Sequence, residues 1–110
     1  MHIVIFITVG GREEGVRIAK ALVEERLAAC VNIIEGMYSV FRWKGKVVKT
    51  KEFLLIAKSV DGLLDSLIER VKELHSYTIP EIISFKIIRG YKEYLDWIVS
   101  NVKTISIKKG

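Results

Sequence analysis

The apolar residues of the chain fall into two patterns, continuous runs and runs with helical spacing. Residues 3–9, IVIFITV, form a continuous β-branched run that ends at Gly10 and Gly11, which predicts a buried strand. Between residues 12 and 28 apolar side chains recur every three or four positions, with carboxylates in the first turn, so a first helix is predicted there. Its apolar stripe consists of Val16, Ala19, Val23 and Leu27.

Two long segments rich in β-branched and aromatic residues follow the first helix. Residues 29–43 and 46–59 are separated only by Lys44-Gly45, a connection that fits a hairpin of two antiparallel strands. Gly36 interrupts the first arm, which indicates a bulge or bend. We therefore expect the far end of the hairpin to leave the plane of the main sheet.

The second half of the chain repeats the change from helical to extended patterns. Residues 61–75 carry Leu, Ile and Val at helical spacing, which predicts a second helix. Pro80 then excludes a helix and opens a strand at residues 81–88. A third helix is predicted at residues 91–102, and residues 104–108, TISIK, alternate like a short strand.

The order of these elements predicts an α+β fold, a ferredoxin-like βαββαβ sandwich with an extra C-terminal helix. In this arrangement we expect all three helices to cover one face of a single antiparallel sheet. The other face would alternate apolar and polar residues if it met water, but residues 3–7 and 53–57 are apolar throughout. A second copy of the chain is expected to cover that face, which makes the protein an obligate oligomer. The alternative is a monomer whose central strands are simply hydrophobic.

Composition narrows the class of protein further. The chain has 110 residues, of which 50% are hydrophobic, and we expect a single domain over residues 1–110. One cysteine excludes an internal disulfide, which favours a cytoplasmic location. No apolar run reaches membrane-spanning length, so no membrane partner is expected. The net charge is +5, but Lys and Arg are spread along the chain apart from a cluster at residues 42–51, a weak sign of a polyanion partner.

The sequence does not match two nucleotide-binding motifs and one RNA-binding motif that it partly resembles. The turn GGREEG at residues 10–15 lacks the Lys and Ser/Thr of a Walker loop and the second glycine of a dinucleotide fingerprint. The hairpin tip, residues 38–51, interleaves aromatic and basic side chains as single-stranded nucleic-acid binders do. It lacks the glycine and aromatic pattern of an RNA-recognition strand, so we expect no nucleic-acid partner. Its aromatic side chains instead suit an interface with a neighbouring subunit.

Cys30, Glu52 and Lys58 are the residues of the hairpin that can carry chemistry. Cys30 has apolar neighbours, as a small core residue does. With a base such as His75 beside it, Cys30 would instead be a nucleophile or half of a soft site for copper or zinc. Glu52 and Lys58 lie on a strand that we expect to be covered, so each needs a partner or access to water.

The segment HSYTIPE, residues 75–81, gathers several functional side chains around the only proline. His75 ends the second predicted helix, where its charge suits the negative helix end. Pro80 begins the next strand without losing a ladder hydrogen bond. The turn between them brings Tyr77 and Glu81 near His75.

Taken together, several stretches resemble the CutA1 divalent-cation tolerance family over residues 3–102, in the family's order and spacing. They are LAACVNI at 27–33, SVFRWKGK at 39–46, Glu52, Lys58, HSYTIPEI at 75–82 and YLDWI at 94–98. The resemblance implies a ferredoxin-like subunit in a tight homotrimer, similar to the PII signalling proteins, whose long hairpins clasp neighbouring subunits. It also implies a role in tolerance to copper and other divalent metals.

The same resemblance implies a cleft between subunits that holds either a metal ion or a small anion. The residues that would line it are Cys30, Trp43, Glu52, Lys58, His75, Tyr77 and Glu81. Cys30 and His75 would be the metal ligands, whereas an anion would be drawn to Lys58 and His75. Some members have a cysteine and a second histidine where this chain has Ile7 and Leu74, which weakens the case for a complete copper site.

Two functions follow as hypotheses. The first is a trimeric divalent-cation tolerance protein that binds copper or another divalent metal in the cleft between subunits. The alternative is a PII-like sensor or scaffold without a metal site, in which Lys58 holds a small anionic ligand. An enzyme is not expected, because the sequence offers no oriented triad, paired catalytic acids or cofactor loop.

Overall fold

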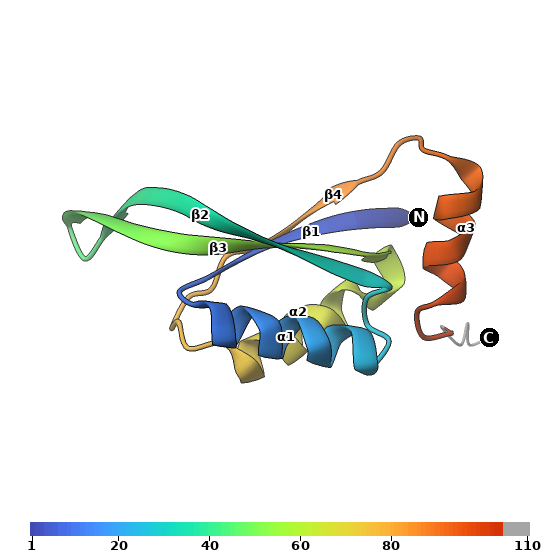
Figure 1. The fold of residues 1–110 in the computed structure, drawn as a ribbon, viewed down its shortest axis with the longest axis horizontal. Helices are drawn as coiled ribbons and strands as arrows, with labels where there is room; N and C mark the ends of the chain where they lie inside the picture. The colour runs from blue at the N-terminus through green and yellow to red at the C-terminus, as the bar shows by residue number, and fades with distance from the viewer. Residues whose placement is uncertain (105–110) are drawn as a thin grey trace, which may run out of the picture.

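The computed structural model describes residues 1–104 and confirms the predicted order of elements. Four antiparallel strands form one sheet in the order β2-β3-β1-β4, and α1 and α2 lie side by side under one of its faces (Figure 1). The elements are β1 (His2–Val9), α1 (Arg12–Glu24), β2 (Cys30–Trp43), β3 (Lys46–Val60), a short 3-10 helix (Asp61–Leu63), α2 (Leu64–Leu74), β4 (Ile82–Lys86) and α3 (Lys92–Ser100). The strand predicted at 104–108 lies, from residue 105 on, outside the described residues.

The core lies between the sheet and the two helices beneath it. Because side chains alternate across a strand, β1 directs every second residue toward α1 and α2, and these side chains are fully buried or nearly so. Ile5 and Ile7 pack in one cluster with Ile18 of α1 and Leu67 of α2. Each large aliphatic side chain buried in this way stabilises the fold by about 1.5–3 kcal/mol.

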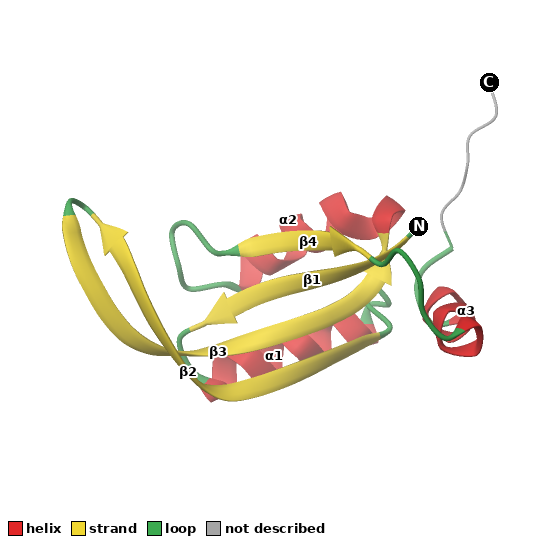
Figure 2. Ribbon diagram, turned by 90° about the horizontal axis from the view of Figure 1, so that it is seen from above, coloured by secondary structure: helices red, strands yellow, loops and turns green. Residues whose placement is uncertain are grey.

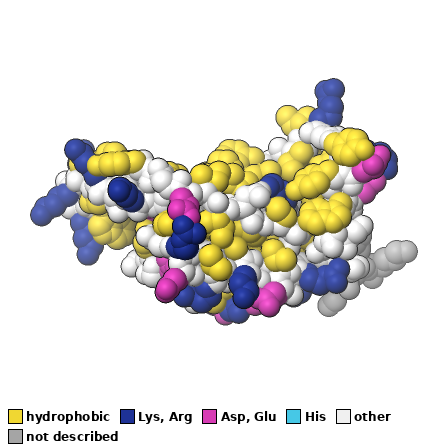
Figure 3. All heavy atoms as spheres, viewed as in Figure 1, with side chains coloured by type: hydrophobic (Ala, Val, Ile, Leu, Met, Phe, Trp, Pro, Cys, Tyr) yellow, Lys and Arg dark blue, Asp and Glu magenta, His cyan; other side chains and the backbone are white. Residues whose placement is uncertain are grey.

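The opposite face of the sheet, here called the open face, has no helix over most of its area (Figure 2). Its apolar side chains are Val4, Phe6, Ile34, Leu54, Ile56, Ile83 and Phe85. The rings of Phe6 and Phe85 meet edge to face, with their centroids 5.1 Å apart. Figure 3 shows hydrophobic side chains gathered in the hollow on this side of the molecule. The sheet is therefore apolar on both faces, as predicted, and one chain covers only one of them.

The position of α3 corrects the expectation that three helices share one face. The two helices α1 and α2 already fill the face beneath the sheet, and residues 87–91 carry the chain past the end of β4. Consequently α3 packs against the ends of β1 and β3 (Figures 1 and 2). It forms a second small core there with Ala29, Leu63, Ile98 and Val102.

The ends of several elements differ from the predicted ones. The first helix ends at Glu24 rather than at residue 28, because Arg26 adopts a left-handed conformation with φ 60°. The N–H groups of Leu27 and Ala28 then both donate to the carbonyl of Leu22. Leu27 and Ala28 are nevertheless buried in the core, which explains why the apolar pattern ran past the true end of the helix. Strand β4 is also shorter than predicted, at Ile82–Lys86.

The hairpin of β2 and β3 extends beyond the sheet, as predicted (Figures 1 and 2). Its two-residue turn has positive φ at both Lys44 and Gly45, 50° and 77°, as a type I′ turn requires. Gly36 has φ 81°, and the strand register shifts between Ile34 and Met37. The predicted bulge is therefore present, and it bends the outer hairpin away from the sheet.

Within residues 1–104, no helix combines the length and the apolar character that crossing a membrane would require.

Candidate functional site

A pocket lies between the outer part of the hairpin and the loop after α2, and we call it the hairpin pocket. It has a volume of about 410 Å³ and is lined by Thr8, Ser39, Val40, Phe41, Trp43, Glu52, Tyr77, Ile79 and Glu81. An adjoining hollow of about 450 Å³ separates Phe41 and Trp43 from residues 76–79. The hairpin pocket therefore brings together four of the residues predicted for the cleft, namely Trp43, Glu52, Tyr77 and Glu81.

Glu52 is the buried charge of this pocket. Only 6% of the residue is exposed, and its Oε2 accepts a hydrogen bond of 2.7 Å from the Tyr77 hydroxyl. Burial, together with the hydrogen bond to Glu52 and its negative charge, raises the pKa of Tyr77 well above the usual value. The phenol thus stays a proton donor at neutral pH. Glu52 forms no ion pair with the residues that the structure describes.

His75 holds the loop in place through both of its ring nitrogens. Nε2 lies 2.7 Å from the carbonyl oxygen of Thr8, and the N–H of Tyr77 donates to Nδ1 over 3.1 Å. This pattern assigns the proton to Nε2, because a carbonyl can only accept. His75 is itself buried. A metal could therefore bind His75 only if one of these hydrogen bonds were broken, and its role as a metal ligand stays a prediction.

A second contact fixes the start of the same loop. The N–H of Ser76 donates to Oε2 of Glu14 over 2.7 Å. Burial of Glu14 acts to raise its pKa, but the hydrogen bonds from Ser76 outweigh this and lower the pKa below the usual value. Glu14 therefore stays ionised and ties the loop to the first turn of α1.

Cys30 and Lys58 lie at the other end of the sheet, so a single chain does not gather all seven residues, and the cleft between subunits stays a prediction. They face each other across β2 and β3, with Nζ of Lys58 3.9 Å from Sγ of Cys30, and Nζ also contacts Oδ1 of Asn32. Lys58 is six positions from Glu52 along β3, a span of about 20 Å. One chain therefore does not bring Cys30 and His75 together. Cys30 begins β2 beside Lys58, whereas His75 contacts Thr8 near the end of β1, at the opposite end of the sheet.

The surroundings of Cys30 include a residue that sequence reasoning did not assign to a site. Burial, followed by the proximity of Cys30, raises the pKa of Tyr94 on α3. Asn32, the other new neighbour, is two residues from Cys30 and thus on the same face of β2. That spacing was a usable signal, whereas Tyr94 could not be found from the sequence because α3 was expected on the opposite face.

The described residues do not assemble a full metal-binding cluster within one chain. No group of three or more His, Cys, Asp and Glu side chains comes together within residues 1–104. The hairpin pocket offers the two carboxylates Glu52 and Glu81, with hydroxyl oxygens of Thr8 and Ser39 in its lining. These are oxygen donors, which suit hard divalent cations rather than Cu(I).

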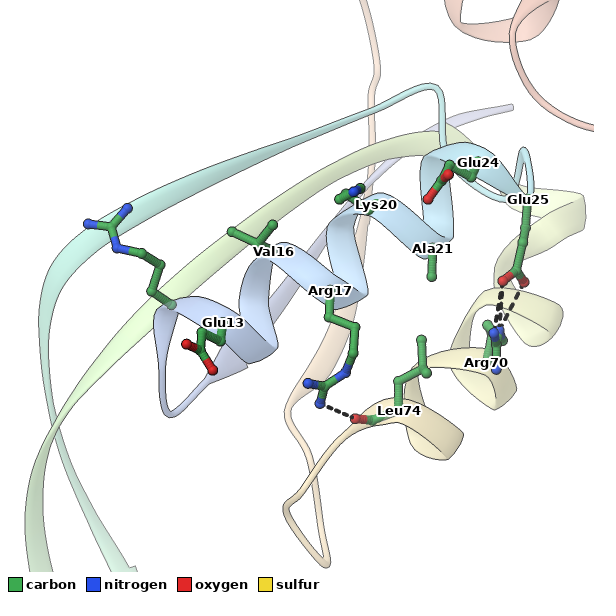
Figure 4. Close-up of a pocket in the computed structure, with 10 residues that line it drawn as sticks. Glu13, Val16, Arg17, Lys20, Ala21, Glu24, Glu25, Arg70 and Leu74 are labelled. Atoms are coloured by element: carbon green, nitrogen blue, oxygen red, sulfur yellow. Dashed lines mark hydrogen bonds and ion pairs between the residues drawn. The ribbon is translucent and has the colours of Figure 1, made fainter.

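A larger groove of about 760 Å³ runs along the outer surface between α1 and α2 (Figure 4). Its charged side chains are largely satisfied by the chain itself. Arg70 forms a bidentate pair with Glu25, with N–O distances of 2.9–3.0 Å, and Arg17 donates to the carbonyl of Leu74 over 3.3 Å. The groove contains no predicted site residue, and we assign it no function.

Known proteins match the chain over almost its whole length. The family model for the CutA1 divalent ion tolerance protein matches residues 3–101. The divalent-cation tolerance protein CutA of Thermus thermophilus is 52% identical over 101 residues, which are 92% of this chain and 98% of that protein. Its namesake in Archaeoglobus fulgidus is 46% identical over 103 residues, 94% of this chain and all of that protein.

Solved structures agree with this assignment. The structure of the Thermus thermophilus protein superposes with a TM-score of 0.92 at 51% identity, over 94% of this chain and all of that one. The structure of the Archaeoglobus fulgidus protein has a TM-score of 0.91 at 46% identity with the same coverage. The Archaeoglobus fulgidus protein is described as periplasmic, so a cytoplasmic location for this chain stays a prediction. By sequence, motif and fold, the chain belongs to the CutA1 divalent ion tolerance protein family.

Proposed function

We propose that the chain contributes to divalent-cation tolerance by binding a divalent cation in the hairpin pocket of an oligomer. The observation that carries this proposal is Glu52, a carboxylate that is 94% buried and bonded only to a neutral phenol among the described residues. A buried charge needs an opposite charge or a metal ion nearby, because desolvation without one is unfavourable by roughly several kcal/mol per ion.

The donor atoms set the kind of cation. Glu52 and Glu81 supply carboxylates to the lining of the pocket, and Thr8 and Ser39 supply hydroxyls. Oxygen ligands favour cations such as Mg²⁺, Mn²⁺ and Ca²⁺, and Zn²⁺ also accepts carboxylates. Two carboxylates do not complete a coordination sphere, so water or a second copy of the chain supplies the remaining ligands. A copper site would need Cys30 of one copy beside the pocket of another.

The open face supports an oligomeric assembly. Ile83 and Phe85 are 46% and 50% exposed although both are large and apolar, and soluble monomers seldom leave a continuous apolar surface uncovered. We propose that copies of the chain cover this face for one another in a homotrimer. Such packing would also place a neighbouring subunit near the hairpin pocket.

The test is a calorimetric titration of the metal-free protein with Mn²⁺, Zn²⁺, Cu²⁺ and Cu⁺. We expect saturable binding of at least one divalent cation, weakened about tenfold or more in Glu81→Gln, which removes one carboxylate ligand and leaves the Tyr77 contact intact. Glu24→Gln on the exposed surface of α1 is the matched control and should bind as the unchanged protein does. Each variant is compared at the same oligomeric state.

The pattern across variants decides between the possible sites. Binding that is insensitive to Glu81→Gln but lost in Cys30→Ser would move the metal to the Cys30 end of the sheet and contradict the proposal. His75→Ala is expected to weaken the fold of the loop more than the intrinsic metal affinity, because both ring nitrogens already have partners. Absence of any binding would leave the cation-site proposal without support.

A second function is favoured by Lys58. Its half-buried ammonium group contacts Cys30 and Asn32 and has no carboxylate partner among residues 1–104. A small anionic ligand at this position would make the protein a PII-like sensor rather than a metal binder. Anion binding lost in Lys58→Met, without any cation binding by the unchanged protein, would select this function.

A further inference from the structure

The net charge of the protein resides on one projecting segment, the outer hairpin at residues 37–51, here called the hairpin arm. It contains five basic residues and no acidic one, namely Arg42, Lys44, Lys46, Lys49 and Lys51. The rest of the chain has 13 basic and 13 acidic residues, so its formal charge is zero and the whole chain's +5 belongs to the arm. Figure 3 shows Lys and Arg side chains gathered around the far end of the hairpin.

The strand register divides the arm into two different faces. Phe41, Trp43, Val48 and Thr50 line the hollow beside the hairpin pocket, so they belong to the face that turns toward the loop after α2. The alternate positions point the other way. That second face, here called the cationic face, carries Tyr38, Arg42, Val47, Lys49 and Lys51.

The charges of the cationic face are not neutralised within the chain. Lys49 and Lys51 lie two residues apart on one strand, about 7 Å from each other, and Arg42 is a diagonal neighbour of Lys49 across the hairpin. None of the three forms an ion pair with the residues that the structure describes, and Arg42 donates only to the Gly45 carbonyl. Like charges at this spacing repel one another, and a linear anion laid along the strands would relieve that repulsion.

We propose that the cationic face binds a chain of inorganic polyphosphate. A repeating anion fits a row of basic side chains along two paired strands, and its recognition needs charge alone. Single-stranded nucleic acid fits less well, because binding it relies on aromatic rings on which bases stack. The arm places Phe41 and Trp43 on the other face, and only Tyr38 remains with the lysines.

The test measures the binding of a fluorescent polyphosphate chain at several salt concentrations, with EDTA in every buffer. EDTA removes cations that could bridge the anion to carboxylates, so the result is independent of the proposed metal site. The double variant Lys49→Ser/Lys51→Ser should weaken binding at low salt by about tenfold or more. It should also reduce the slope of log affinity against log salt by about 1.4, the loss expected for two phosphate contacts.

A matched control separates a local surface from the effect of overall charge. Lys20→Ser/Lys103→Ser also removes two positive charges, but from exposed positions outside the arm. The affinity for polyphosphate and the salt slope should stay within about twofold of those of the unchanged protein. An equal loss in both double variants, or no binding at physiological salt, would overturn the proposal. Tighter binding to a single-stranded oligonucleotide or to anionic vesicles than to polyphosphate at equal charge would also overturn it. Circular dichroism and light scattering confirm that each variant keeps its fold and oligomeric state.

Discussion

At the scale of single residues, a short network of hydrogen bonds couples the loop after α2 to two strands of the sheet. His75 bonds to the backbone of Thr8 on β1, and Tyr77 bonds to both His75 and Glu52 on β3. Glu52 and His75 are both buried, so loss of these bonds would leave buried polar atoms without partners. The shape of the hairpin pocket therefore depends on the network as well as on apolar packing.

The Tyr77 hydroxyl is expected to contribute measurably to stability. Tyr77→Phe leaves the buried carboxylate of Glu52 without its donor, which should lower the free energy of unfolding by about 1–3 kcal/mol. Tyr38→Phe removes the hydroxyl of an exposed tyrosine and should change almost nothing. Urea unfolding at fixed protein concentration measures both. Equal stabilities for the two variants would show that the Glu52 contact is not important.

The same residue predicts how stability depends on alkaline pH. The pKa of Tyr77 is raised in the folded protein above its usual 10.0, first by burial and then by Glu52. The unfolded chain therefore loses the Tyr77 proton at a lower pH than the folded protein does. The contribution of this proton to the free energy of unfolding is complete below pH 10 and falls as the pH rises further. Tyr77→Phe should flatten the decline in stability above pH 10, and an unchanged decline would contradict the assignment.

Residue chemistry could be predicted only in part. The turn at Pro80 predicted that Tyr77 and Glu81 lie near His75. The rings of Tyr77 and His75 do lie together, with centroids 4.7 Å apart. Glu81 lines the hairpin pocket with Glu52 and Tyr77. The placement of Trp43 and Glu52 came from the family resemblance and not from spacing. The contact of His75 with Thr8 could not be foreseen, because it joins the loop to the backbone of β1, a strand far away in the sequence.

At the scale of elements, the hairpin turn is under local strain that substitution can test. Lys44 holds a left-handed φ of 50°, which disfavours most side chains but suits asparagine. Lys44→Asn should therefore stabilise the protein by about 0.5–1 kcal/mol, whereas Gly45→Ala, at φ 77°, should destabilise it by about 1 kcal/mol. Thermal unfolding of the two variants should shift in opposite directions. A shift in the same direction would mean that the turn geometry is wrong.

The elements themselves could be predicted because their apolar periods are clear, but their ends and packing could not. Leu27 and Ala28 continue the apolar pattern of α1 although the backbone turns away at Arg26. For α3, the apolar stripe identified a helix without saying which surface it covers. The location of α3 depends on the path that residues 87–91 take beyond β4, and the apolar pattern does not determine that path.

At the scale of the whole molecule, the open face should decide the oligomeric state. Light scattering on dilute protein is expected to report three copies per particle. Phe85→Lys introduces a charge into the open face and should shift the protein toward smaller species. Val23→Lys changes an apolar residue of α1 that is 41% exposed and should leave the assembly intact. A monomeric unchanged protein, or dissociation by the control alone, would place the interface elsewhere.

The separation of a neutral body from a charged arm also governs colloidal behaviour. At neutral pH the net repulsion between molecules of this protein comes from the five charges of the arm, because the remainder of the chain has a formal net charge of zero. Proteins close to zero net charge tend to associate and precipitate. A partner that neutralises the five charges of the arm would therefore bring the formal net charge of the chain to zero, and we expect it to favour association between molecules.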